Sequence, residues 1–82
     1  MLEIEYEPKL LKIIEKIKDK TTKEKIKKQI VRIIENPEIG KPMRYSRKGA
    51  REIYISPFRL SYFYIKEDDK IVFLDLYHKD EQ

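Results

Sequence analysis

Four ionisable side chains in the second half of the chain could act together on a phosphodiester. They are Glu52, Arg59, His78 and Lys79. Cleavage of RNA through its own 2′-hydroxyl needs a base for the hydroxyl proton, an acid for the leaving 5′-oxygen, and cations where charge develops on the phosphorus. Glu52 is our candidate base, His78 the candidate acid, and Arg59 and Lys79 the candidate cations. This chemistry requires neither a metal nor another cofactor.

Strand periodicity predicts which of these side chains share a face. The segment 52–65 alternates and is rich in Ile, Tyr and Phe, which is typical of two strands folded back on each other. Alternation places Glu52, Arg59 and Lys79 on one open face of the sheet. His78 has the opposite parity, unless the last strand has already ended there.

Each catalytic assignment has a simpler alternative. A histidine near a C-terminus is often only a surface residue, and Glu52 could pair with Arg51 or with a cross-strand cation. The six tyrosines are expected mostly to pack in the core and on the sheet faces.

The net positive charge is concentrated around Arg59. From residue 44 to residue 59 there are five cations and one acid, so this stretch carries net +4, which equals the formal net charge of all 82 residues. Such a cluster predicts contacts with nucleic-acid phosphates, although the same run could be only a solvated loop. The predicted RNA-binding or ribosome-binding residues are Arg44, Arg47, Lys48 and Arg51.

A small α+β fold is expected to position these residues. The expected elements are a strand at 2–6, helices at 8–18 and 21–36, a hairpin at 52–65 that turns at Ser56–Phe58, and a last strand at 71–77. Thr21 and Glu24 have the spacing of a capping box. Each helix shows one apolar stripe, so the pair should cover one face of a small antiparallel sheet in the order β-α-α-β-β-β.

In the last strand, simple alternation predicts one face with Val72, Leu74 and Leu76, and a second face with Phe73, Asp75 and Tyr77.

Length and composition favour a single domain over residues 1–82. The chain has no cysteine, so disulfides and thiolate metal sites are excluded. No apolar run approaches the roughly 20 residues that a membrane helix needs. We therefore expect a cytoplasmic protein without a membrane partner.

The order of elements and several short motifs resemble the RelE/ParE superfamily of toxins across residues 2–79. These motifs are Glu35-Asn36-Pro37 before a glycine-containing loop, the run from Phe58 to Tyr62, and the pair His78-Lys79. The resemblance implies a two-helix hairpin packed on a twisted antiparallel sheet. In this superfamily the RelE branch cuts messenger RNA on the ribosome, and the ParE branch poisons DNA gyrase.

When the family's site residues are matched to this sequence by position, the chain resembles the RelE branch most. Arg59 matches the phosphate-contacting arginine, Lys79 stands where a second catalytic arginine is usual, and His78 matches a histidine often found before it. Glu52 occupies a position that is lysine in the best-known RelE-type sites.

The function expected from this resemblance is that of a ribosome-dependent, metal-independent endoribonuclease toxin that cleaves messenger RNA. Its partners would be the ribosome, messenger RNA and a cognate RelB-like antitoxin, with a heterotetrameric complex as one arrangement. The alternatives are a ParE-like toxin that inhibits gyrase by binding, and a non-catalytic RNA-binding domain of the same fold.

Overall fold

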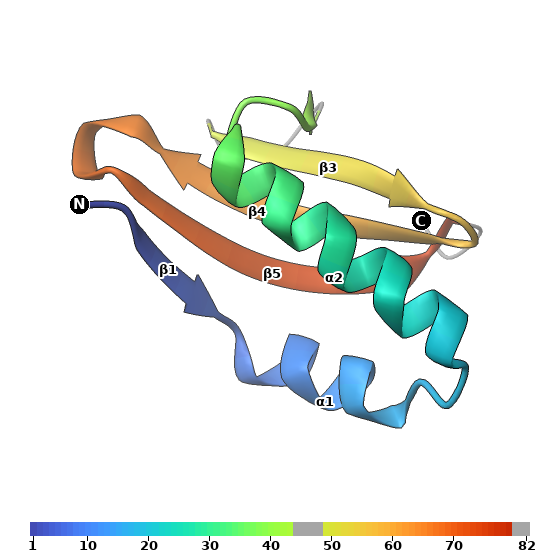
Figure 1. Cartoon of the computed structure of the whole chain (residues 1–82). Helices are drawn as coiled ribbons and strands as arrows, with labels where there is room; N and C mark the ends of the chain where they lie inside the picture. Colours follow the sequence, from blue (N-terminus) through green and yellow to red (C-terminus); the bar gives the residue numbers. More distant parts are fainter. Residues whose placement is uncertain (44–48, 80–82) are drawn as a thin grey trace.

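The computed structural model describes residues 1–43 and 49–79 and has two layers, a five-stranded sheet and two helices on one of its faces (Figure 1). The elements in chain order are β1 (Glu3–Tyr6), α1 (Pro8–Lys16), α2 (Lys20–Glu35), β2 (Lys41–Pro42), β3 (Ala50–Ile55), β4 (Phe58–Ile65), the 3₁₀ turn η1 (Lys66–Asp68) and β5 (Lys70–His78). The predicted α+β class and element order are confirmed. Neither helix, within the described ranges, is long and apolar enough to cross a membrane.

The sheet is mixed rather than wholly antiparallel as expected. Its strand order is β1-β5-β4-β3-β2. Neighbouring pairs from β2 to β5 are antiparallel, whereas β1 runs parallel to β5, with Glu3 opposite Lys70. Because more than 60 residues separate these two strands, no local turn fixes their relative direction, and only the path of the chain through the helices and the meander does.

The core lies between the helices and the sheet. Its buried side chains come from both layers: Leu10 of α1, Ile26 and Ile33 of α2, and Ile55, Leu60, Tyr62, Ile71, Phe73 and Leu76 of the sheet. The predicted apolar stripes of both helices therefore face the sheet. Lys25 of α2 adds a polar tie, because its Nζ donates to the backbone oxygen of Ser56 in the β3–β4 turn at 3.1 Å.

The boundary between the helices differs from the expectation. The first helix ends at Lys16 rather than at residue 18, and the N-cap of α2 is Asp19 rather than Thr21. The Asp19 carboxylate accepts from the Thr21 backbone N–H at 3.2 Å and from the Thr22 hydroxyl at 2.6 Å. An aspartate caps the free N–H groups of a first turn well, so the helix begins earlier than a cap at Thr21 would allow.

A β-bulge changes the alternation of β5. The β4–β5 register shifts between Ser61 and Tyr62, so that Ser61 pairs with Asp75 and Tyr62 pairs with Phe73. The extra residue, Leu74, reverses the parity on either side of it. Phe73 is therefore fully buried in the core, and its predicted place beside Asp75 and Tyr77 is wrong.

Candidate functional site

An open-face pocket of about 330 Å³ lies on the sheet face opposite to the helices. It is lined by Lys41 of β2, Glu52 and Tyr54 of β3, Arg59 of β4, and Lys79 just after β5. Three cations, one carboxylate and one aromatic ring therefore meet on a face built from four strand ends. Residues on paired strands hold their side chains more rigidly than residues on loops, which suits a site that must orient a ligand.

The strand register brings these side chains together. Tyr54 pairs with Arg59, and Arg59 pairs with Tyr77, so these three form one cross-strand row. Lys41 pairs with Glu52 in the neighbouring row. Directly opposite residues point to the same face of a sheet, so the predicted grouping of Glu52, Arg59 and Lys79 on one face is what the structure has.

Glu52 is the centre of the polar contacts in the open-face pocket. Its Oε1 accepts from Arg59 Nη1 at 2.6 Å, and its Oε2 accepts from the Tyr77 hydroxyl at 2.7 Å. Both carboxylate oxygens are thus occupied, as the alternative of a cross-strand ion pair predicted. Among the described residues, the buried Nε of Arg59 has no hydrogen-bond acceptor, so the guanidinium is only partly satisfied by the protein.

Lys79 and Tyr54 form the outer part of the pocket. The Lys79 Nζ lies 5.7 Å from the centre of the Tyr54 ring, a cation–π distance, and the Lys79 backbone N–H donates to the oxygen of Pro57 at 3.1 Å. Tyr54 is 53% exposed. An exposed aromatic face beside a cation can stack a nucleobase next to a bound phosphate.

His78 does not join this group. Strand β5 extends through His78, which pairs with Phe58, and the two rings meet edge to face at 6.0 Å. Phe58 packs against the core, so His78 lies on the helix side of the sheet, whereas Tyr77 lies on the pocket side. The condition under which His78 could have reached the site, an earlier end of the strand, is not met.

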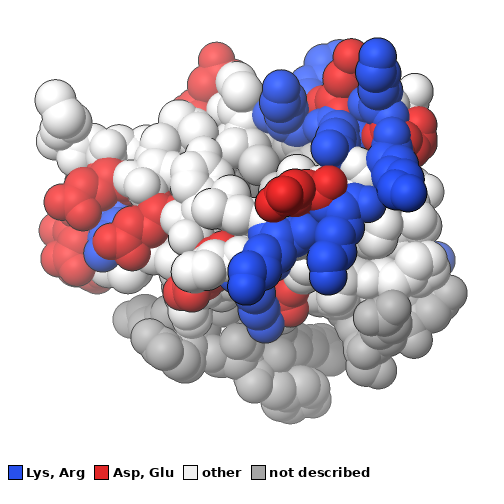
Figure 2. Space-filling model, turned by 90° about the horizontal axis from the view of Figure 1, so that it is seen from below, with Lys and Arg blue, Asp and Glu red and all other residues white. Residues whose placement is uncertain are grey.

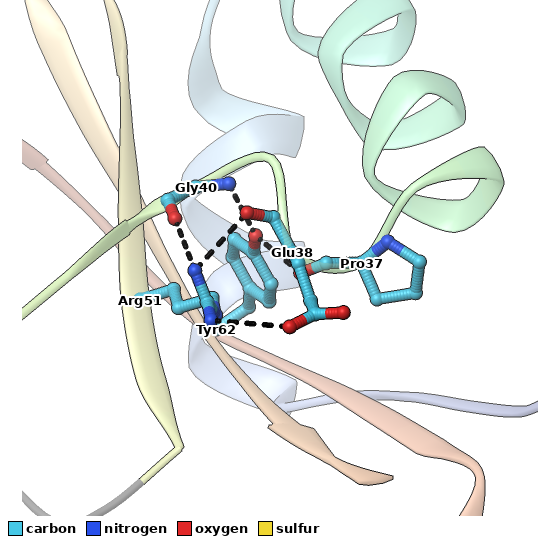
Figure 3. A network of polar contacts seen from close by, with 5 residues as sticks. All are labelled: Pro37, Glu38, Gly40, Arg51 and Tyr62. Carbon is cyan, nitrogen blue, oxygen red and sulfur yellow. Dashed lines mark hydrogen bonds and ion pairs between the residues drawn. The ribbon is translucent and has the colours of Figure 1, made fainter.

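Arg51 is also directed away from the open-face pocket. Its guanidinium donates to the backbone oxygens of Glu38 and Gly40 and lies 3.8 Å from the Glu38 carboxylate (Figure 3). The other predicted RNA-binding residues, Arg44, Arg47 and Lys48, lie outside the described residues.

Sequence reasoning missed Lys41. The sequence of segment 38–50 predicts an irregular loop with a short strand near Met43, and the structure has the two-residue strand β2 at Lys41–Pro42, but the prediction did not assign Lys41 to the site. The available signal was its place immediately after Gly40 and before Pro42, where a short edge strand beside β3 could form.

The helix pair carries a net positive charge. Residues 8–28 contain nine lysines and three acids, a net charge of +6. Figure 2 shows Lys and Arg gathered on the side of the molecule where α1 ends and α2 begins, and Asp and Glu mainly on the opposite side, near β1 and the β4–β5 connection. The molecule therefore has a strong charge asymmetry in addition to the open-face pocket.

Residues 4–82 match the family model for the ParE toxin of the parDE type II toxin-antitoxin system. The chain belongs to this toxin family. None of the curated proteins matches the sequence.

Solved structures of related toxins share the fold of this ParE-family chain. The isolated E. coli RelE toxin is 22% identical, with a TM-score of 0.81 over 100% of this chain and 88% of that one. A chain of the archaeal RelE-RelB complex from Pyrococcus horikoshii OT3 is 13% identical, with a TM-score of 0.79 and coverage of 99% and 98%. A chain of the heterotetrameric YoeB-YefM complex from Staphylococcus aureus is 23% identical, with a TM-score of 0.70 and coverage of 95% and 97%.

Proposed function

We propose that this toxin is a metal-independent endoribonuclease that cleaves messenger RNA on the ribosome. The observation that carries the proposal is the open-face pocket, in which three cations surround a carboxylate beside an exposed tyrosine ring. A site that bound a protein surface by occupancy alone would not need this combination in one place. The fold is shared with the isolated RelE toxin, so it is compatible with this activity.

In the proposed reaction, Arg59 and Lys79 hold the scissile phosphate and Tyr54 stacks a neighbouring base. Glu52 accepts the proton of the 2′-hydroxyl, whose oxygen attacks the phosphorus. The bond to the 5′-oxygen breaks, and that oxygen takes a proton from Lys79, which lines the pocket and is our proposed proton donor. The expected products are a 2′,3′-cyclic phosphate and a free 5′-hydroxyl.

Glu52 must be released from its resting pair before it can act as this base. Arg59 occupies Oε1 in the structure. A bound phosphate offers the guanidinium a bidentate anionic partner and would draw Arg59 toward the substrate. The Arg59 Nε–H has no acceptor within residues 1–43 and 49–79, which supports this exchange, because a phosphate gives the guanidinium more acceptors than Glu52 does.

The ribosome enters the proposal because the open-face pocket is shallow. It contains no deep cavity that would fix a flexible RNA strand in the in-line geometry, and positioning can supply several kcal/mol of a barrier. A ribosome that holds the messenger in place would provide this term. The basic helix pair and the predicted cations Arg44, Arg47 and Lys48 offer further phosphate contacts with ribosomal RNA, and the site of action would be the cytoplasm.

We also propose that an antitoxin binds and neutralises this chain. Structural relatives were solved as the E. coli RelBE complex and as the heterotetrameric YoeB-YefM complex. The edge of β1 and the basic helix surface are suitable for an acidic partner that adds a strand or a helix.

Gyrase inhibition is the second candidate, because the matching family model is that of the ParE toxin. The deciding experiment incubates purified protein with programmed ribosomes, with free RNA and with gyrase in a supercoiling assay. Cleavage only in the ribosome reaction, abolished by Arg59→Ala, is expected. Rapid cutting of free RNA would show that the ribosome is not required. Inhibited supercoiling without RNA cleavage would show that the protein inhibits gyrase and would contradict the proposed function.

A further inference from the structure

We propose that Lys41 is a phosphate-binding residue of the open-face pocket and that Tyr62 and Arg51 are positioning residues that act through it. This inference rests on the proposed RNA-directed function and adds a third cation to its site.

Lys41 lies directly across from Glu52 in the strand register. Arg59 approaches the same carboxylate from the neighbouring strand on the other side. The carboxylate is therefore flanked by a cation on each side, and Lys41 is exposed, whereas the Arg59 side chain is only 33% exposed. When a phosphate replaces Glu52 as the partner of Arg59, Lys41 is placed to bind a second oxygen of the same group.

Strand β2 cannot hold Lys41 in place by itself. It has only two residues and lies at the edge of the sheet, and its second residue is Pro42, which has no N–H to donate. The position of Lys41 therefore depends on the segment Pro37–Gly40, which joins α2 to this strand.

A buried tyrosine anchors that segment from the core side. Tyr62 is 0% exposed, and its hydroxyl accepts from the Gly40 N–H at 2.8 Å and donates to the Pro37 oxygen at 2.8 Å (Figure 3). A Cβ at Gly40 would meet the Tyr62 hydroxyl oxygen, so only glycine permits this approach. The residue just before Lys41 is thus fixed to the centre of the sheet.

Arg51 completes the anchor. Its Nη1 donates to the backbone oxygens of Glu38 at 3.0 Å and Gly40 at 2.7 Å (Figure 3). Arg51 and Glu52 are consecutive in β3 and point to opposite faces, so the strand that presents Glu52 to the pocket also holds the segment that presents Lys41. With its donors used in this way, Arg51 acts on RNA indirectly, not as the phosphate contact that its charge alone suggests.

The test measures binding of a short single-stranded RNA with 2′-O-methyl sugars, which cannot be cleaved, as a function of salt concentration. For single strands, each phosphate contact contributes about 0.7 to the slope of log affinity against log salt. Lys41→Ala should lower the affinity roughly 10-fold, a typical value for a hydrogen bond to a charged group, and should reduce the slope by about 0.7. Lys41→Arg should retain both values.

The positioning residues are tested by variants that keep the net charge. Tyr62→Phe and Arg51→Lys should reduce the salt slope in the same direction as Lys41→Ala, and neither should add a further loss when combined with Lys41→Ala. Tyr64→Phe is the matched control, because no hydrogen bond of the Tyr64 hydroxyl joins it to the segment before Lys41, and Lys66→Ala controls for loss of a lysine elsewhere. Both controls should bind as the unmodified protein does.

The possible results separate this inference from the proposed function. If the unmodified protein binds the RNA and Lys41→Ala binds equally well, the inference is wrong and the function stands. If the unmodified protein does not bind the RNA, the proposed function fails and the role of Lys41 fails with it. If Arg51→Lys keeps the full salt slope, the positioning role of Arg51 is wrong. Should Tyr62→Phe not fold, Arg51→Lys still decides the question.

Discussion

Arg59 and Glu52 are diagonal neighbours on β4 and β3, and their side chains are joined by a hydrogen bond of 2.6 Å. The same carboxylate also accepts from Tyr77. The arginine proposed to hold a phosphate is therefore bonded to the carboxylate proposed to act as the base. Under the proposed function, binding of RNA by Arg59 would also release Glu52.

Replacement of Arg59 by alanine should abolish toxicity and leave a folded protein. Loss of a cation that contacts a developing negative charge lowers the rate by about 10²- to 10³-fold. Because the Glu52 side chain is only 16% exposed, loss of its partner should also reduce stability, by about 1–2 kcal/mol. The double variant Arg59→Ala/Glu52→Gln should recover the stability but not the activity, and a fully active Arg59→Ala would remove the central assignment of the site.

Replacement of His78 by glutamine should change the cleavage rate on ribosomes by less than about threefold, because the ring lies on the helix side of the sheet beside Phe58. Removal of a true general acid costs about 10²- to 10⁴-fold. Lys79→Ala provides the comparison in the same assay and should have the larger effect. A loss for His78→Gln as large as that for Lys79→Ala would restore His78 to the catalytic group.

Tyr62→Phe should destabilise the protein by about 1–3 kcal/mol at neutral pH, because the Gly40 N–H and the Pro37 oxygen both lose their partner. Burial raises the pKa of Tyr62 above its usual 10.0, so the neutral hydroxyl favours the folded state. Its contribution is complete below pH 10.0 and is lost as the pH rises through the folded-state pKa. Urea unfolding at a series of pH values should show that the difference in unfolding free energy between the original protein and Tyr62→Phe narrows in this alkaline range. A difference that stays constant with pH would contradict this prediction.

Asp19→Ala should lower the thermal midpoint at pH 7, since the cap of α2 is lost. The Thr22 hydroxyl, followed by the backbone N–H groups of the first turn, lowers the pKa of Asp19 from its usual 3.8. The stabilisation is therefore present above pH 3.8 and is lost as the pH falls through the lower folded-state pKa. Asp19→Asn, which caps at every pH, is the control. The thermal midpoints of the original protein and Asp19→Ala should converge in acid. An unchanged difference between the two midpoints would show that the carboxylate charge does not contribute to the stability.

An antitoxin that adds a strand should bind at the outer edge of β1, all four residues of which are exposed. The N–H groups of Glu3 and Glu7 donate to the β5 side, so the alternate N–H groups of Ile4 and Tyr6 point outward. Ile4→Pro removes one of these donors and should weaken a co-purified complex with the neighbouring small protein by at least roughly 10-fold. Ile4→Ala keeps the donor and should bind more tightly than Ile4→Pro. Equal binding by the two variants would exclude strand addition at this edge.

Local sequence patterns predict most of the architecture, because apolar periodicity dictates which face of each element is buried. The stripes of Leu10, Ile26 and Ile33 fixed the helix faces, and the alternation around Glu52 and Arg59 fixed their common side of the hairpin. These patterns are local, and a single residue of slip would expose the core side chains, so they leave little freedom.

Three features depend on the folded chain as a whole, because no local pattern encodes them. The direction of β1 depends on contacts with β5 more than 60 residues away, and the burial of Phe73 depends on a bulge against Ser61 and Tyr62. The third feature is the surroundings of Arg51 and Lys41: Arg51 donates to the segment before β2, whereas Lys41 lines the open-face pocket. A lysine or arginine in the sequence shows only that a positive side chain is available. Its partner depends on which backbone oxygens, or which open pocket, the fold places near that side chain.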